Sequence, residues 1–249
     1  MRAGTEVIDK PGRMVSPDEL LLVLEDPNPY VSRGGLKLRH ALRRFGIDPT
    51  GMRALDIGAS TGGFTDCLLQ AGAEGVVAVD VGYGQLDWKL QQDERVRVVD
   101  RTNARELTLE AVGGEPFDLA VVDVSFISLK LILPRIFEMM HPGGQVVALV
   151  KPQFEVGRQE VEHQGVIKDP GKHYKAVVAV GACVETHRWG LADVTASPIL
   201  GQKGNREFFI HCTRASYGQV WESGALSRRI MTSPGDDEEP DLEIEIIEE

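Results

Sequence analysis

Residues 54–71, ALDIGASTGGFTDCLLQA, combine an apolar strand-like run, a turn of small residues and a segment of helical length. Similar apolar runs recur along the chain, separated by stretches long enough for helices; the first five are Ala54–Ile57, Val76–Val79, Val96–Val99, Leu119–Val122 and Val146–Val150. Strands that alternate with helices are joined by right-handed crossovers and form a parallel sheet with helices on both faces. The sequence therefore predicts an α/β fold with a doubly wound sheet.

Helices are expected before and between these runs. Apolar residues recur at helical spacing from Leu36 to Phe45, and Gly46 is suited to end that helix. Thr65–Ala71 and Leu129–Met140 are also of helical length, whereas residues 154–167, FEVGRQEVEHQGVI, are typical of a long polar loop.

The end of the domain has a different pattern. We expect a helix with Asp169 as its N-cap and Pro170 at its first position, running to about His187. Two further apolar runs, Val194–Ser197 and Phe208–Cys212, are separated by a turn too short for a crossover, which suits an antiparallel hairpin. We predict seven strands, mostly parallel, with an antiparallel last strand.

Composition excludes several classes of protein. The chain has 249 residues, of which 42% are hydrophobic and 26% charged, so collagen-like, low-complexity and disulfide-scaffold proteins are excluded. No apolar run approaches the roughly 20 residues of a membrane span, and the start lacks the apolar core of a signal peptide. The three cysteines have no zinc-site spacing. We expect a soluble cytoplasmic protein without a metal and without a membrane partner.

Charge is distributed unevenly. The net charge is −11, but residues 235–249, GDDEEPDLEIEIIEE, hold nine acidic residues and no basic one, so residues 1–234 carry 29 acids against 27 bases. Such an acidic run is typical of a solvated tail. By contrast, residues 30–45 contain no acid and five bases, namely Arg33, Lys37, Arg39, Arg43 and Arg44. This basic segment is a candidate footprint for the phosphates of a nucleic acid.

The small-residue turn is a candidate ligand site, because ligands of doubly wound folds bind at the carboxyl ends of the strands. Its pattern, D-x-G-x-x-x-G-G from Asp56 to Gly63, differs from the G-x-G-x-x-G of dinucleotide sites. Asp80 ends the second strand, where a carboxylate can accept hydrogen bonds from a ribose, and Asn103 would lie near an adenine. Two carboxylates without an arginine clamp favour S-adenosylmethionine over a phosphate-bearing nucleotide such as NAD. A tight turn without any ligand is the alternative.

Four charged residues come at the ends of expected elements. They are Lys37, Asp123, Lys151 and Glu207. Asp123 and Lys151 follow strands that we expect to be neighbours beside the small-residue turn, so these charges are candidates for one active site.

These residues resemble the TlyA (hemolysin A-like) group of the FtsJ-type RNA 2′-O-methyltransferases. The resemblance spans Tyr30 to Thr213 and is carried by the blocks PYVSRGGLKL, ALDIGASTGGFTDCLLQAGA, VVDVSFISL, LVKPQFE and SPILGQKGNREFF. It implies a Rossmann-like S-adenosylmethionine-dependent methyltransferase fold, with the family's lysine–aspartate–lysine–glutamate tetrad at Lys37, Asp123, Lys151 and Glu207. Its cofactor motifs fall on Asp56, Gly58, Ala59, Ser60, Gly62, Gly63, Phe64, Asp80, Asn103 and Asp123.

The resemblance also implies a substrate and partners. The substrate is a cytidine 2′-hydroxyl in ribosomal RNA, of the 16S type, the 23S type or both, presented as RNA or as a ribosomal subunit. Arg33, Arg39, Arg43 and Arg44 would then bind its phosphates.

The residue types suit this chemistry. A ribose hydroxyl is a poor nucleophile until its proton is removed, so the enzyme needs an aligned base. The ordinary pKa of lysine, about 10.4, is about three units too high for that role, and a second ammonium or partial burial disfavours the charged form. Our hypothesis assigns Lys151 as the general base and Lys37 as its electrostatic and positioning partner.

The resemblance predicts three parts of the chain. Residues 1–29 resemble the C-terminal half of an S4-like RNA-binding domain, residues 30–214 form the methyltransferase domain, and residues 215–249 are an extension that ends in the acidic tail. Other functions left open are a non-catalytic RNA-binding or ribosome assembly protein with the same fold, an NAD-dependent oxidoreductase and, least favoured, a hemolysin.

Overall fold

The computed structural model describes residues 2–3, 6–7, 14, 16, 21–22, 28–157, 159, 161, 165–221 and 224–231. Within residues 1–27 it describes three short strands, β1 (Arg2–Ala3), β2 (Glu6–Val7) and β3 (Leu21–Leu22), paired antiparallel in the order β2-β1-β3. Most of the remaining residues of the expected S4-like segment, and the whole acidic tail, lie outside the described residues.

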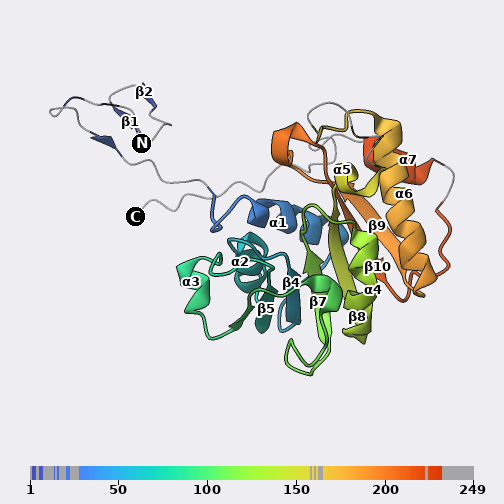
Figure 1. Ribbon diagram of the computed structural model, residues 1–249, viewed down its shortest axis with the longest axis horizontal. Coiled ribbons are helices and arrows are strands. Elements are labelled where there is room, and N and C mark those ends of the chain that lie inside the picture. The colour runs from blue at the N-terminus through green and yellow to red at the C-terminus, as the bar shows by residue number, and fades with distance from the viewer. Residues whose placement is uncertain are drawn as a thin grey trace.

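A seven-stranded sheet forms the centre of the molecule (Figure 1). Its strand order is β6-β5-β4-β7-β8-β10-β9, and β10 runs antiparallel to both of its neighbours while the other strand pairs are parallel. The strands are β4 (Arg53–Ile57), β5 (Gly75–Val79), β6 (Val96–Val99), β7 (Phe117–Val122), β8 (Met140–Val150), β9 (Gly190–Ala196) and β10 (Phe208–Thr213). The predicted doubly wound sheet, its seven strands and its antiparallel last strand are confirmed.

Helices cover both faces of this sheet, because alternate residues of each strand point to opposite sides. On one face, the apolar residues of α1 (Gly34–Phe45), α2 (Gly63–Gln70) and α3 (Trp88–Gln91) pack with Ala54, Val121 and their counterparts. On the other face, α4 (Leu133–Glu138), α6 (Pro170–Thr186) and α7 (Ala225–Met231) pack with Leu55, Val122 and theirs. The central strands β4, β5, β7, β8 and β10 are therefore largely buried on both sides, as a parallel sheet requires, whereas the edge strand β6 is partly exposed.

The ends of two helices follow the sequence signals. Asp169 caps α6 by accepting a hydrogen bond from the Gly171 amide at 2.8 Å, with Pro170 at the first helical position. Gly46 ends α1 in the left-handed conformation, at φ +64°, which glycine adopts without strain.

Two segments differ from expectation. The predicted helix 129–140 is divided into a 3-10 turn, η2 (Leu129–Leu131), and α4, while Met140 already begins β8. The loop expected from Phe154 starts later, because a short helix, α5 (Pro152–Glu155), follows Lys151 directly. Proline at the first position of α5 favours a helix start, since its fixed φ suits the first turn.

Part of the extension after residue 214 belongs to the core. Leu226 and Ile230 of α7 are buried in the apolar cluster that includes Val180 of α6 and Val194 of β9. Within the part of the chain that the structure describes, no helix is long and apolar enough to cross a membrane.

Candidate active site

Two cavities lie side by side at the carboxyl ends of the parallel strands, where doubly wound folds bind ligands. The first, which we call the lysine cavity, measures about 470 Å³ and is lined by Lys37, Lys151, Asp123 and Glu207 among others. The second, the Asp80 cavity, measures about 310 Å³ and is lined by Asp80, Asn103 and apolar side chains. The two share Gly58, Ser60, Asp123 and Ser125 as a common wall.

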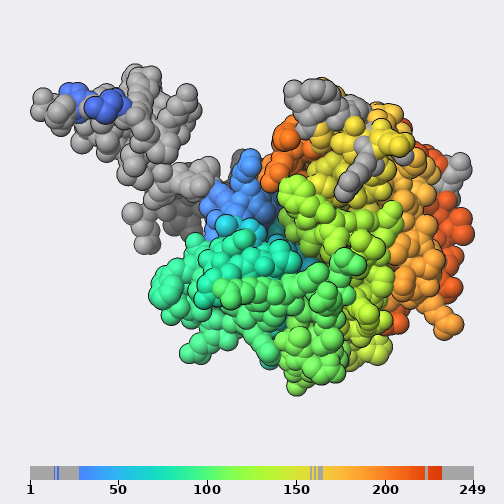
Figure 2. All heavy atoms as spheres, viewed as in Figure 1, coloured from blue at the N-terminus to red at the C-terminus, as the bar shows by residue number. Residues whose placement is uncertain are grey.

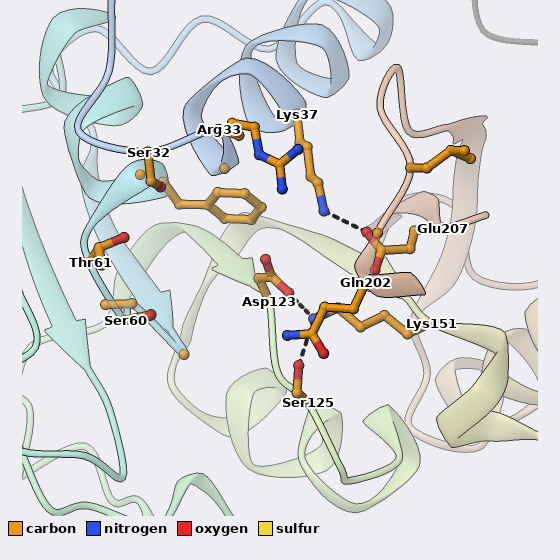
Figure 3. A pocket seen from close by; sticks show the side chains of 17 residues that line it. Ser32, Arg33, Lys37, Ser60, Thr61, Asp123, Ser125, Lys151, Gln202 and Glu207 are labelled. Carbon is orange, nitrogen blue, oxygen red and sulfur yellow. Dashed lines mark hydrogen bonds and ion pairs between the residues drawn. The ribbon is translucent and has the colours of Figure 1, made fainter. Parts of the chain in front are cut away.

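The four charged residues form two ion pairs within the lysine cavity (Figure 3). Lys37 Nζ, from α1, lies 2.6 Å from Oε2 of Glu207, the residue before β10. Lys151 Nζ, directly after β8, lies 2.5 Å from Oδ1 of Asp123, directly after β7. The side chains of Lys37, Lys151 and Glu207 are only 13%, 11% and 3% exposed. Charges that are this buried need a partner, and each lysine has one.

Ser125 is a further polar contact that the sequence reasoning did not single out. Lys151 Nζ donates a hydrogen bond to Ser125 Oγ at 2.9 Å, in addition to its ion pair with Asp123. The Lys151 amine is therefore held from two sides by one short segment, residues 123–125. The signal was present, because Ser125 lies within the VVDVSF block, but only the folded loop shows which side chain faces the lysine.

The loop before β10 contributes another wall. Leu200, Gly201 and Gln202 line the lysine cavity, and Gln202 projects into it in Figure 3. A Cβ on Gly201 would overlap the Glu207 carboxylate, so glycine is needed for the backbone to approach that side chain. The sequence block SPILGQKGNREFF contains these residues, but their approach to Glu207 depends on the hairpin geometry.

The small-residue turn brings two strand ends into contact. Gly58 has φ +85°, and a Cβ there would overlap the Asp123 carbonyl oxygen. Ala59, Ser60, Gly63 and the ring of Phe64 line the lysine cavity beside it. The turn therefore places the end of β4 against the end of β7, on the wall between the cavities.

Asp80 is fixed at the Asp80 cavity by backbone amides. Its Oδ2 accepts a hydrogen bond from Ser60 N at 2.8 Å and its Oδ1 accepts one from Gly82 N at 2.7 Å. Asn103 lines the same cavity and accepts from Arg105 N at 3.1 Å, which caps the 3-10 turn η1 (Ala104–Glu106). The carboxylate and the amide thus face one concave space.

Two of the expected cofactor residues lie behind the cavities rather than on their walls. Asp56 is fully buried, its Oδ2 accepts from Thr65 Oγ1 at 2.6 Å, and its Oδ1 has no hydrogen-bond partner among the described residues. Burial raises the pKa of Asp56 to about 7, against the opposing hydrogen bond from Thr65. A Cβ on Gly62 would overlap Leu90. Asp56 and Gly62 therefore pack on the core side of the small-residue turn, opposite the cavities.

The four arginines of the basic segment occupy different surroundings. Arg33 lines the lysine cavity, and Arg39 and Arg43 are exposed on another side of α1, where both line a separate groove. Arg44 is half-buried and lies near Asp193 of β9. Burial raises the pKa of the Asp193 carboxyl, and the charge of Arg44 lowers it in part. The structure therefore presents Arg33, Arg39 and Arg43 to a ligand more openly than Arg44.

The donor set of the Asp80 cavity fits an adenosyl group. Val81, Ile127 and Ile132 offer apolar walls to a base, while the Asp80 carboxylate can accept hydrogen bonds from ribose hydroxyls. No lysine or arginine lines this cavity in the described residues, so it offers no clamp for a phosphate. The described residues also include no group of three or more His, Cys, Asp or Glu able to hold a metal ion.

Comparison with known proteins gives consistent results. Residues 30–214 match the family model described as FtsJ-like methyltransferase. The chain is 49% identical over 202 residues to the 16S/23S rRNA (cytidine-2′-O)-methyltransferase TlyA of Mycobacterium tuberculosis, covering 81% of this chain and 75% of that protein. It is 41% identical over 211 residues to Hemolysin A of Brachyspira hyodysenteriae, covering 84% of this chain and 86% of that protein.

A solved structure agrees with these relatives. A Streptococcus thermophilus protein that carries the name hemolysin superposes with a TM-score of 0.79 at 42% identity, over 89% of this chain and 80% of that one. The fold and the sequence therefore point to the same family.

Proposed function

The chain belongs to the FtsJ-like methyltransferase family, and from this premise we propose that it methylates a cytidine ribose 2′-hydroxyl of 16S or 23S ribosomal RNA, or of both, with S-adenosylmethionine as the methyl donor. The observation that carries the proposal is the paired arrangement of Lys37 with Glu207 and of Lys151 with Asp123 in one cavity that adjoins the Asp80 cavity. The choice of base and RNA follows the name of the Mycobacterium tuberculosis relative.

Asp80 and Asn103 would hold the ribose and the adenine of the cofactor, and residues 58–60 would approach its amino acid portion. When bound, S-adenosylmethionine supplies a methyl group that is already electrophilic. The protein residues must therefore orient the ribose oxygen for in-line attack and take its proton.

Lys151 is placed to accept that proton. Its amine lies at the floor of the lysine cavity and is held by Asp123 and Ser125, so a neutral Lys151 would direct its lone pair at a fixed position. The 2′-hydroxyl proton would pass to Lys151 Nζ as the ribose oxygen takes the methyl group, whose bond to sulfur breaks and leaves a neutral thioether. Lys37, paired with Glu207 across the same cavity, would hold the ribose and its adjoining phosphate in place.

Ribosomal RNA, free or in a ribosomal subunit, is the proposed partner. Arg33 lines the lysine cavity and Arg39 and Arg43 are exposed nearby on α1, so the basic segment can bind phosphates on the approach to the cavity. Binding of this kind contributes affinity without reading sequence.

The direct test is methyl transfer from radiolabelled S-adenosylmethionine to unmethylated 30S and 50S subunits, assayed separately. We expect the wild-type protein to label a 2′-O-methylcytidine that nuclease digestion locates, and Lys151→Ala to abolish the label. Lys89→Ala, an exposed lysine of α3, is the matched control and should label normally.

Two results would contradict the proposal. Near-normal transfer by a folded Lys151→Ala protein would remove Lys151 from the role of base. Cofactor binding without any transfer to either subunit would favour the non-catalytic RNA-binding or assembly protein instead.

A further inference from the structure

A third cavity adjoins α1 and shares no lining residue with the two already described. It measures about 460 Å³ and runs between α1 and α2, and we call it the α1–α2 groove. Its polar groups come from Tyr30, Arg39, Arg43, Asp48 and Gln70, and its apolar surface comes from Leu42, Ile47, Pro49, Cys67 and Ala71. In Figure 2 the light-blue atoms of the α1 region reach the surface beside the teal atoms of α2.

The chain builds the groove through specific contacts. The backbone amide of Val31 donates to Asp66 Oδ2 at 2.9 Å, and Gln70 Nε2 donates to the Pro29 carbonyl at 3.0 Å. These bonds fix the segment before α1 against α2. Tyr30 is then pressed onto α1 so closely that a Cβ on Gly35 would overlap its ring.

The two arginines of the groove suit the phosphates of a nucleotide, while the one carboxylate among its lining residues, Asp48, accepts hydrogen bonds from Thr50 N and Thr50 Oγ1 through its Oδ1. Arg39 and Arg43 are exposed, one helical turn apart, and neither forms an ion pair with a described residue. The Arg39 guanidinium lies 5.9 Å from the centre of the Tyr30 ring. Burial raises the pKa of Tyr30 to about 12, and the phenol is neutral near pH 7, as it also is at the ordinary tyrosine pKa of about 10. Guanidinium groups bind phosphates, and an aromatic ring with an adjacent arginine is a stacking surface for an unpaired base.

The groove is joined to the active site by a single turn of chain. Tyr30 faces the groove, whereas Ser32, Arg33 and Gly34 line the lysine cavity. Along the axis of α1, Arg33 and Arg39 are separated by only about 9 Å, at 1.5 Å per residue. This separation is short enough for one strand of RNA to place a ribose in the lysine cavity and a neighbouring nucleotide in the groove.

We propose that the α1–α2 groove binds a nucleotide that flanks the methylated one on the same single strand of RNA, with its base against Tyr30 and its phosphates on Arg39 and Arg43. This inference rests on the proposed RNA substrate, and it adds a second recognition site that is separate from the catalytic cavity. The groove would thereby hold the strand in register while the target ribose is aligned.

The test measures RNA contact without methyl transfer. A single-stranded oligouridine that contains 5-iodouridine is irradiated with the full-length protein, and cross-linked peptides are identified by mass spectrometry. We expect a cross-link on Tyr30. Fluorescence titrations with oligouridine at several salt concentrations give the slope of the logarithm of the binding constant against the logarithm of the salt concentration. The double variant Arg39→Ala with Arg43→Ala should make this slope shallower by about 1.4, at about 0.7 for each lost contact to a single-strand phosphate.

Variants of Tyr30 separate stacking from charge. Tyr30→Leu should weaken oligouridine binding by about tenfold with an unchanged salt slope, because stacking does not release counterions, whereas Tyr30→Phe keeps the ring and should bind normally. Arg135→Ala, which removes an exposed arginine of α4 that is paired with Glu138, is the charge control and should change nothing. Cofactor affinity and thermal unfolding of each variant show whether the fold is intact.

The outcomes distinguish this proposal from the proposed function. Methyl transfer to a ribosomal subunit, together with no Tyr30 cross-link and an unchanged salt slope in the double arginine variant, would overturn the groove and leave the function standing. A groove filled by another segment of the chain or by a protein partner would give that same negative result. A Tyr30 cross-link without transfer to either subunit would support the groove and refute the methyltransferase proposal.

Discussion

Asp56 lies in an environment that its position in the sequence does not suggest. Its carboxyl is fully buried behind the small-residue turn, and the pKa of about 7 results first from burial, with Thr65 opposing and the charges of Asp123 and Asp80 reinforcing the increase. A sequence motif can indicate that an acid occurs before the turn. It cannot indicate whether that acid faces the cavity or the core, because this depends on the packing of α2 against the sheet.

The raised pKa of Asp56 predicts a pH-dependent cost to stability. Because its folded-state pKa of about 7 is above the unfolded value of 3.8, the folded state holds the proton more tightly, and stability is lost as pH rises from about 4 to about 7. Asp56→Asn stays neutral throughout. Wild type therefore loses stability between pH 4 and pH 7, and the variant does not. The free energy of unfolding of the variant minus that of wild type should increase over this pH range by up to about 4 kcal/mol, at 1.36 kcal/mol per pKa unit.

Urea unfolding of both proteins at a series of pH values from 4 to 8 checks this prediction. The comparison cancels the other titrating groups, which the two proteins share. A difference in the free energy of unfolding that is constant over the whole range would show that Asp56 stays ionised in the folded protein.

At the scale of elements, the loop after β7 and the short helix α5 are connected twice. Lys151 reaches back to Asp123 and Ser125, and four residues later Glu155 accepts hydrogen bonds from Ser128 Oγ at 2.6 Å and from Leu129 N at 2.7 Å. Glu155 is 8% exposed. The second connection holds the loop whose first residues contact the proposed base, and we therefore infer that Glu155 positions Lys151.

This arrangement predicts an effect of Glu155→Gln on turnover. An amide can replace one acceptor oxygen but not both, so one buried donor loses its partner, at a cost of about 1–3 kcal/mol. We expect kcat for methyl transfer to fall about tenfold as the loop shifts, since a small misplacement of a catalytic group has large effects.

The control for this prediction is Gln153→Ala, in the same short helix but without a hydrogen-bond partner for its side-chain oxygen in the described residues. Steady-state kinetics should show a lower kcat with a nearly unchanged KM for S-adenosylmethionine in Glu155→Gln only. If Glu155→Gln lowers the stability of the protein but leaves kcat at the value of the control, Glu155 has a structural role alone.

At the scale of the whole molecule, the sequence was sufficient for the strands, the antiparallel β10 and the adjacency of β7 and β8, which brings Asp123 and Lys151 to one place. These features follow from local periodicity and from the rules of strand connection. The pairing of Lys37 with Glu207 across 170 positions, and the division of 129–140 into two elements, depend on packing between distant segments. No local pattern contains that information.

The extension after residue 214 provides the last prediction, because α7 closes one side of the domain. Leu226 and Ile230 are 9% and 1% exposed within the core cluster, and Arg229 Nε lies 3.4 Å from Asp193 Oδ1 on the edge strand β9. Removing residues 225–249 uncovers this apolar surface, and each lost side chain costs about 1.5–3 kcal/mol. A truncation after Met231 removes the same acidic run, residues 235–249, but leaves α7 in place.

Thermal unfolding should therefore show a midpoint at least about 5 °C lower for the chain ending at Gly224 than for the chain ending at Met231. Equal midpoints would mean that the methyltransferase domain is complete without α7, and that its burial against β9 and α6 contributes nothing to the stability of the fold.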